Sequence, residues 1–176
     1  MKKIITSFLC VAAATALALP SQAQITARNK YLNAGIGIGA YTAGGIPIGA
    51  SLEVDIKNNI SAGGFVDYAR YGYKAGGYSW HYNFVYFGAR GSYHLIDVLS
   101  GNEASKWDPY AGVSVGVRTA WYSDNQSDTD FESPYAGGVF AGIHVGSRYM
   151  FTDKVGAFAE VGYGVTALRL GVAAKF

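Results

Sequence analysis

Charged and polar side chains recur at every second position in several segments, and this spacing could assemble a buried network of ion pairs. Glu53 and Asp55 are two residues apart, and Arg90 and His94 belong to another such run. Side chains two residues apart point to the same side of a β-strand. Charges gathered in a narrow space must pair, because an isolated buried charge has a large desolvation cost. The spacing therefore predicts structural ion pairing.

We expect this network on the inner face of a closed sheet, joined by His94 and Lys175. Its main predicted members are Glu53, Asp55, Asp67, Arg90, Arg118, His144, Arg148, Glu160 and Arg169. Gly164-Val165 suits a two-residue type II′ turn, which has Gly at its first central position. That turn sets Glu160 opposite Arg169, so we predict an ion pair between these two side chains.

Two glycine-rich strings match motifs of enzymes, but their context favours strands. Residues 112–116 (Gly-Val-Ser-Val-Gly) match the nucleophile elbow, which needs a strand, a turn and a helix. Residues 35–40 (Gly-Ile-Gly-Ile-Gly-Ala) fit a dinucleotide fingerprint, which also needs a following helix. Both strings lie in unbroken alternation, so we predict no catalytic residue, no cofactor and no metal site of this kind.

Ser79 and His81 provide the alternative of a lipid-modifying enzyme, because both could face the outer leaflet of a membrane. A nucleophile of this type needs a base and an acid that orients the base. No acidic residue is near them in the sequence. We favour ordinary interfacial side chains, and hence a protein that is not an enzyme.

The segment 123–133 is acidic and contains no basic residue. Its carboxylates are Asp124, Asp128, Asp130 and Glu132. They could bind Ca²⁺, or bridge a divalent ion to lipopolysaccharide, but the glycine of an EF-hand loop is missing. A solvated loop is the favoured interpretation. Together with Tyr73, Tyr78 and Trp80, this loop is the best candidate for a surface-binding patch.

The first 23 residues have the features of a secretory signal peptide. Lys2 and Lys3 precede an apolar run over residues 4–19, and Ser21 and Ala23 suit cleavage before Gln24. The alternative, a membrane-anchoring helix, is disfavoured because the run is short and no stop-transfer charges follow. We expect an exported chain with one mature domain over residues 24–176.

Composition excludes several other classes of protein. The 24 glycines follow no collagen repeat, and half of the residues are apolar, which excludes disorder. Cys10 is the single cysteine, so neither a disulfide framework nor a multi-cysteine zinc site is available. A net charge of +2 with three histidines argues against a nucleic-acid-binding protein.

Period-two alternation of apolar and polar residues runs through the whole mature chain. The alternating segments are 31–41, 47–56, 60–73, 80–95, 109–122, 134–151, 155–163 and 167–176. Ten tilted strand residues suffice to cross the hydrocarbon core of a membrane. The fold class that we predict is all-β: an eight-stranded antiparallel up-and-down transmembrane β-barrel, whose lumen is filled by side chains.

The apolar face is expected to contact lipid. The polar face carries Gly, Ser and Ala beside a few long charged residues, which fits the narrow interior of an eight-stranded barrel. Aromatic residues gather near the strand ends, as in the girdles of membrane barrels. One predicted girdle contains Tyr68, Trp121, Tyr135 and Tyr163, and the other contains Tyr93, Tyr149, Phe151 and Phe176.

Eight strands place both chain ends in the periplasm, with short turns there and longer loops outside the cell. The external connectors would be 42–46, 74–79, 123–133 and 164–165. The connector 96–107 departs from this pattern, because it would be periplasmic and yet long. A short helix and a mobile loop both remain open for it.

The chain end, residues 169–176 (Arg-Leu-Gly-Val-Ala-Ala-Lys-Phe), resembles the C-terminal assembly signal of outer-membrane barrels. The matching positions are Arg169, Gly171, Ala174 and Phe176, and Ala174 departs from the bulkier residue that is usual there. Residues 109–112, 151–156 and 160–164 resemble the small barrels related to OmpX and the OmpA barrel. This resemblance implies insertion by the barrel-assembly machinery and a structural, adhesin or narrow-porin role.

Together these features predict a bacterial outer-membrane barrel with a closed lumen and a structural or surface-interaction role. The alternatives are a narrow porin for small solutes and, third, a lipid-modifying enzyme. The expected partners are outer-membrane lipids and lipopolysaccharide, the assembly machinery, and an extracellular ligand or host surface. We expect a monomer.

Overall fold

Eight antiparallel strands form a closed barrel in the part of the chain that the computed structural model describes, namely residues 29–40, 45–57, 59–75, 78–95, 106–124 and 137–176. The strands are β1 (Lys30–Ala40), β2 (Ile48–Lys57), β3 (Ile60–Ala75), β4 (Tyr78–His94), β5 (Trp107–Asp124), β6 (Gly138–Met150), β7 (Val155–Tyr163) and β8 (Thr166–Lys175). Each predicted segment corresponds to one strand, so the up-and-down barrel is confirmed.

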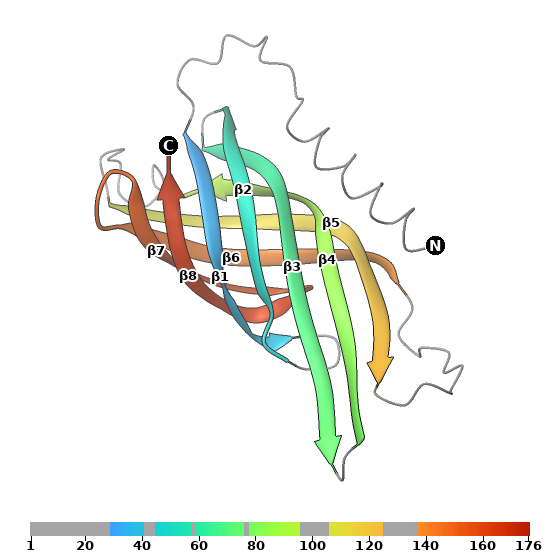
Figure 1. Cartoon of the computed structure of the whole chain (residues 1–176). Coiled ribbons are helices and arrows are strands. Elements are labelled where there is room, and N and C mark those ends of the chain that lie inside the picture. The colour runs from blue at the N-terminus through green and yellow to red at the C-terminus, as the bar shows by residue number, and fades with distance from the viewer. Residues whose placement is uncertain (1–28, 41–44, 58, 76–77, 96–105, 125–136) are drawn as a thin grey trace.

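Each strand pairs with its neighbours in sequence, and β1 also pairs with β8, which closes the sheet. Tyr31 of β1 lies opposite Lys175 of β8, and Gly35 lies opposite Gly171. Figure 1 shows β1 in blue beside β8 in red. We call the end where β1 begins and β8 ends the terminal end, and the opposite end the far end.

The barrel is inverted relative to a water-soluble protein, with apolar side chains outside and charged side chains inside. Val113 is 63 % exposed and Val172 is 61 % exposed, whereas Glu53 and Arg148 are each 0 % exposed. This arrangement follows from the period of two, because successive strand residues point to opposite faces. The predicted outward orientation of the apolar side chains is confirmed.

Exposed aromatic side chains lie near both ends of the wall. Tyr93, Phe151 and Phe176 are exposed near the terminal end, and Trp121 and Tyr163 are exposed near the far end. Trp107 is a further exposed member at the terminal end, where its ring packs 4.9 Å from the ring of Tyr149. Tyr135 of the predicted girdle lies outside the described residues.

Three strands continue beyond the closed part of the barrel at its far end. The last pair between β2 and β3 is Ile48 with Tyr68, and the last pair between β5 and β6 is Arg118 with Gly138. Beyond these pairs, the described residues of β3 and β5 pair as strands only with β4. We call this part, residues 69–75, 78–84 and 120–124, the extension, and it projects at the bottom of Figure 1.

The observed strand bounds correct three predicted connectors. The connector expected over 123–133 starts two residues too early, because Ser123 and Asp124 belong to β5. The connector expected over 74–79 is wrong in its bounds, because Lys74 pairs with Ser79 and Ala75 with Tyr78 in the β3–β4 hairpin. The connector expected over 96–107 is one residue too long, because Trp107 begins β5 and pairs with Tyr149. Residues 96–105 lie outside the described part of the chain.

Short turns join the strands where special backbone conformations are needed. Gly164 has a φ of 123°, which suits the first central position of the two-residue turn between β7 and β8. Asn59, with a φ of 57°, follows β2, and Asn tolerates this left-handed region better than most residues. Within the described residues there is no helix long and apolar enough to cross a membrane.

Candidate functional site

The centre of the lumen is held by Arg90 of β4, which bridges two acidic residues from other strands. Its Nε lies 3.0 Å from Glu53 Oε1 as an ion pair, and its Nη2 donates to Glu160 Oε2 at 2.8 Å. The hydroxyl of Tyr110 donates to the same Glu160 oxygen at 3.1 Å. Both carboxylates are thereby compensated in a space that excludes bulk water.

Arg148 of β6 fills the lumen closer to the terminal end. Its guanidinium lies between two aromatic rings, 4.5 Å from the ring centre of Tyr31 and 4.2 Å from that of Tyr110. It donates to Asp108 Oδ2 at 2.7 Å, to Asn33 Oδ1 at 3.1 Å and to Glu53 Oε1 at 3.4 Å. Arg148 of β6 therefore connects three other strands, β1, β2 and β5, through one buried cation.

The predicted ion pair between Glu160 and Arg169 is wrong, although the predicted register is right. The two residues lie opposite each other on β7 and β8. Arg169 instead donates from Nη2 to Asp67 Oδ1 on β3 at 2.6 Å, and Glu160 accepts from Arg90. Long side chains in a narrow barrel reach across the lumen, so strand adjacency does not decide the partner.

The remaining predicted members of the network occupy its edges. Asp55 accepts from Asn29 Nδ2 at 3.0 Å, and His144 Nε2 lies 3.1 Å from Ser92 Oγ. Arg118 is half-buried on β5, opposite Gly138. Asp108 and Tyr110 also belong to the network but were not predicted, although they have the same parity as the inward residues of β5.

The ion pairs form one layer across the lumen, and aromatic side chains form a second layer towards the far end. We call it the aromatic layer; it consists of Phe65, Tyr86 and Phe140 in the barrel and continues into the base of the extension through Phe84 and Tyr82, against which Trp80 and Tyr122 pack. The ring of Phe140 packs edge-on against Phe65 at 6.0 Å and against Tyr86 at 5.6 Å. Phe84 and Tyr86 have the same parity as Arg90, which is the signal that would have placed them inside.

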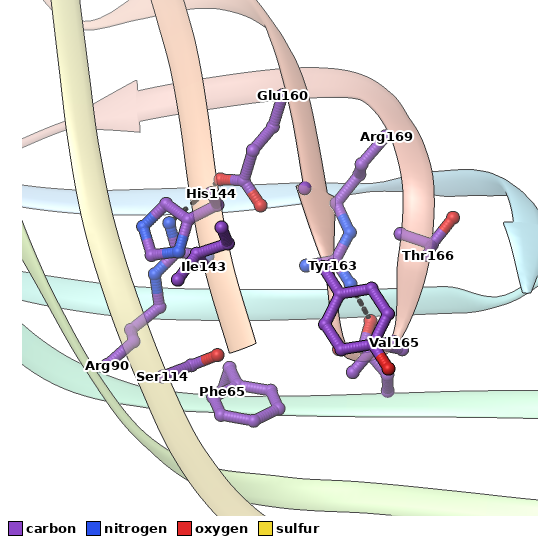
Figure 2. Close-up of a pocket in the computed structure, with 12 residues that line it drawn as sticks. Phe65, Arg90, Ser114, Ile143, His144, Glu160, Tyr163, Val165, Thr166 and Arg169 are labelled. Carbon is purple, nitrogen blue, oxygen red and sulfur yellow. Dashed lines mark hydrogen bonds and ion pairs between the residues drawn. The ribbon is translucent and has the colours of Figure 1, made fainter. Parts of the chain in front are cut away.

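A small cavity of about 30 Å³ lies between the ion pairs and the aromatic layer. Figure 2 shows Arg90, His144, Glu160 and Arg169 around it, with Ser114 beside Arg90. One or two water molecules would fill this volume. The cavity is partly open and too small for an organic substrate. Charged residues such as Arg90 and Glu160 share its lining with apolar ones such as Phe65 and Val165.

Ser61, His94 and Asp108 have the spacing of a hydrolase triad at the terminal end. His94 Nδ1 lies 2.7 Å from Asp108 Oδ1, and His94 Nε2 lies 3.0 Å from Ser61 Oγ. However, Ser61 is 0 % exposed, and its hydroxyl donates to Glu53 Oε2 at 2.9 Å. A nucleophile must be free to reach a substrate carbonyl, so this geometry favours a structural role.

The other predicted site residues lie on the wall or outside the described part. Ser79 and His81 lie two residues apart on the outer face of the extension. The acidic side chains that the structure describes lie in the lumen or in the turn before β7, so none of them is placed to orient His81 as a base. Asp124 ends β5, and Asp128, Asp130 and Glu132 fall outside the described residues. Among the residues described, no cluster of three or more His, Cys, Asp or Glu is suited to a metal ion.

The positions of the C-terminal signal combine inward and outward roles. Arg169 and Gly171 face the lumen, where Gly171 leaves room for the ring of Phe158. Phe176 is exposed at the terminal end. The last strand therefore presents an aromatic residue to the membrane side and ion-pairs on the inner side.

No protein-family model matches the chain, and no curated protein matches it. Among solved structures, the outer membrane protein OprG of Pseudomonas aeruginosa is similar over 85% of this chain and 96% of OprG, with 11% identity and a TM-score of 0.55. Ail of Yersinia pestis is similar over 85% of this chain and 95% of Ail, with 11% identity and a TM-score of 0.50. These similarities show a shared barrel fold.

Proposed function

We propose that this chain, which has the fold of the small eight-stranded outer-membrane β-barrels, is a non-enzymatic outer-membrane protein whose lumen is closed and whose extension acts at the cell surface. The observation that carries the proposal is the lumen itself. Two layers of packed side chains cross it, and the cavity between them holds little more than water. A surface role then belongs to the part of the chain beyond the membrane.

The closed lumen argues against the alternative of a narrow porin. A solute would have to pass the ion pairs around Arg90 and Arg148, both of which are buried. Opening a path means leaving at least one buried charge without its partner, which costs about 3–5 kcal/mol. The solute would also have to displace the aromatic layer.

Conductance in planar lipid bilayers tests this closure. The refolded protein is expected to produce no stable current steps, because both lumen layers would have to move. The matched control combines Arg148→Ala and Tyr110→Ala with Phe84→Ala and Tyr86→Ala, which widens both layers and should produce current steps. Stable steps from the unaltered protein, with a conductance that follows salt concentration, would establish the porin alternative instead.

The extension offers aromatic side chains for binding. On its inner face the rings of Tyr71, Trp80 and Tyr82 pack edge to face, with centroids 5.7 Å and 5.6 Å apart. Tyr71 is exposed, and Trp80 is half-buried. Aromatic side chains of this kind are enriched where proteins bind partners. Beyond Tyr68, β3 forms no further strand pair with β2, and Gly45 lies against the Arg70 carbonyl on that side.

A surface role is in keeping with one of the similar structures. Ail is the attachment invasion locus protein of Yersinia pestis, and its structure contains the heparin analogue sucrose octasulfate. For this chain we propose a host surface or another extracellular ligand as the partner class.

We propose the bacterial outer membrane as the location, with the terminal end in the periplasm and the extension outside the cell. Outer-membrane lipids and lipopolysaccharide would surround the apolar wall. The barrel-assembly machinery would insert the chain, using the strand that ends in Phe176. Residues 1–23 lie outside the described part, so the signal peptide stays a prediction, as does the monomeric state.

A further inference from the structure

Lysine side chains surround the terminal end of the barrel. Lys30 begins β1, Lys57 ends β2, Lys106 precedes β5, Lys154 lies in the turn before β7, and Lys175 ends β8. The first four are exposed, and Lys175 is half-buried. We call these five residues the lysine rim.

Three members of the lysine rim are neighbours where the barrel closes, at the end marked C in Figure 1. The backbone N–H of Lys175 donates to the carbonyl of Lys154 at 2.8 Å. Lys30 exchanges two backbone hydrogen bonds with Phe176, which follows Lys175, at 2.9 Å and 3.1 Å. Like charges brought together in this way repel one another and attract an anion.

The described part of the chain supplies no ion-pair partner for this rim. None of the five ammonium groups lies within 4.0 Å of a carboxylate in that part. Asp55 accepts from Asn29, and Asp108 pairs with Arg148, so both are engaged at the edge of the lumen. Asp153 is the exposed acid at this end of the described chain. The lysine rim therefore has an excess of positive charge.

The lysine rim lies next to the exposed aromatic side chains of the terminal end. Trp107 follows Lys106 and is exposed on the wall, and Phe176 is exposed beside Lys30. Aromatic side chains of membrane barrels lie at the level of the lipid headgroups. Lysine stems lie along apolar surface while the ammonium group reaches the polar layer. These ammonium groups are therefore expected at the depth of the lipid phosphates.

The far end of the barrel differs in charge. The connector 123–133 contains four acidic residues and no basic one, and residues 41–47 and 164–165 contain no charged residue. Arg70 and Lys74 are the lysine and arginine residues of the extension. An excess of positive charge is thus specific to the terminal end, so the two ends suit different lipid surroundings.

We infer that the lysine rim binds the phosphate groups of anionic phospholipids, such as phosphatidylglycerol, in the leaflet at the terminal end of the barrel. The ammonium groups donate to phosphodiester oxygens, the acceptors that the described residues do not provide. The inference rests on the proposed membrane location and is independent of the surface role of the extension.

Electron paramagnetic resonance of spin-labelled lipids tests the inference on the refolded protein in phosphatidylcholine vesicles. Traces of labelled phosphatidylglycerol or labelled phosphatidylcholine report how much of each lipid contacts the barrel. At low salt we expect a preference for phosphatidylglycerol, and salt of about 1 M should abolish it by screening the charges. Equal contact of the two labelled lipids at low salt would overturn the inference, as would a preference that salt does not reduce.

Matched variants assign the preference to the lysine rim. Replacing Lys30, Lys57 and Lys154 together with Gln should lower the preference for phosphatidylglycerol by about twofold or more. Replacing the same three residues with Arg keeps their charge and should keep the preference. An unchanged preference in the Gln variant would place the binding elsewhere on the barrel and refute the lysine rim. If this variant does not insert, Lys57→Gln with Lys154→Gln replaces it.

The change in gel mobility on boiling is measured first, because it marks a folded barrel. Its absence in the unaltered protein would refute the membrane location and the lipid site with it. A folded and inserted barrel without lipid preference would refute the lipid site alone. Neither result depends on the conductance or attachment measurements.

Discussion

Buried ionic side chains in this barrel are compensated by several partners each. Arg148 shows the pattern most fully, since it contacts two carboxylates, one amide and two aromatic rings. The planar guanidinium suits this role, because it can donate in several directions and stack on aromatic faces at the same time. Lysine would provide one compact charge and no stacking surface.

At this scale we predict that Arg148→Met destabilises the barrel by about 3–5 kcal/mol, because Glu53 and Asp108 remain buried with fewer partners. Urea unfolding of the refolded protein in micelles measures the change. The matched control is Arg70→Met, since Arg70 is exposed on the extension. Equal losses of stability at the two positions would contradict the role of Arg148.

The partner choices of Glu160 and Arg169 show a limit of reasoning from residues. Turn length and parity were enough to set the two side chains opposite each other on the inner face. They were not enough to predict that Arg90 and Asp67, from strands across the lumen, would bind them at 2.8 Å and 2.6 Å. Those contacts depend on barrel closure, which brings distant strands within reach.

At the scale of the strand, alternation on β5 separates lipid-facing from lumen-facing positions. Val113, Val115 and Val117 are exposed on the wall. Ser114 faces the opposite way and lines the lumen cavity. A polar or charged substitution should therefore destabilise the barrel much more at Val115 than at the adjacent Ser114.

We predict that Val115→Arg destabilises the barrel by about 2–4 kcal/mol when it lies near the middle of the bilayer. Ser114→Asn is the matched control, because the adjacent side chain enters a polar cavity and should cost much less. Unfolding in lipid vesicles measures both variants. Similar losses at Val115 and Ser114 would count against the lipid-facing assignment of this strand.

At the scale of the molecule, the lengths of the strands divide the barrel into two parts. β3, β4 and β5 have 16, 17 and 18 residues, whereas β7 has 9 and β8 has 10. The short strands suffice for closure across a membrane. The additional length of the other three builds the extension.

We predict that replacing both Tyr71 and Trp80 with Ser weakens attachment of cells displaying the protein to surfaces coated with extracellular-matrix proteins. A loss of about tenfold or more is expected when exposed aromatic anchors are truncated. Tyr163→Ser is the control, because Tyr163 is an exposed aromatic on the barrel wall. Both variants should retain the change in gel mobility on boiling that marks a folded barrel. Unchanged attachment of the double variant would exclude the inner face of the extension as the binding site.

The period of two, read along the chain, was sufficient to predict eight strands, their order and the side of each that meets lipid. This is possible because alternation is a local property of an extended backbone. Pairing across the lumen, the aromatic layer, the length of β3 and β4 beyond residue 73, and the enclosure of His94 came only from the tertiary structure. Each depends on contacts between strands that are distant in sequence, and such contacts exist only once the sheet has closed.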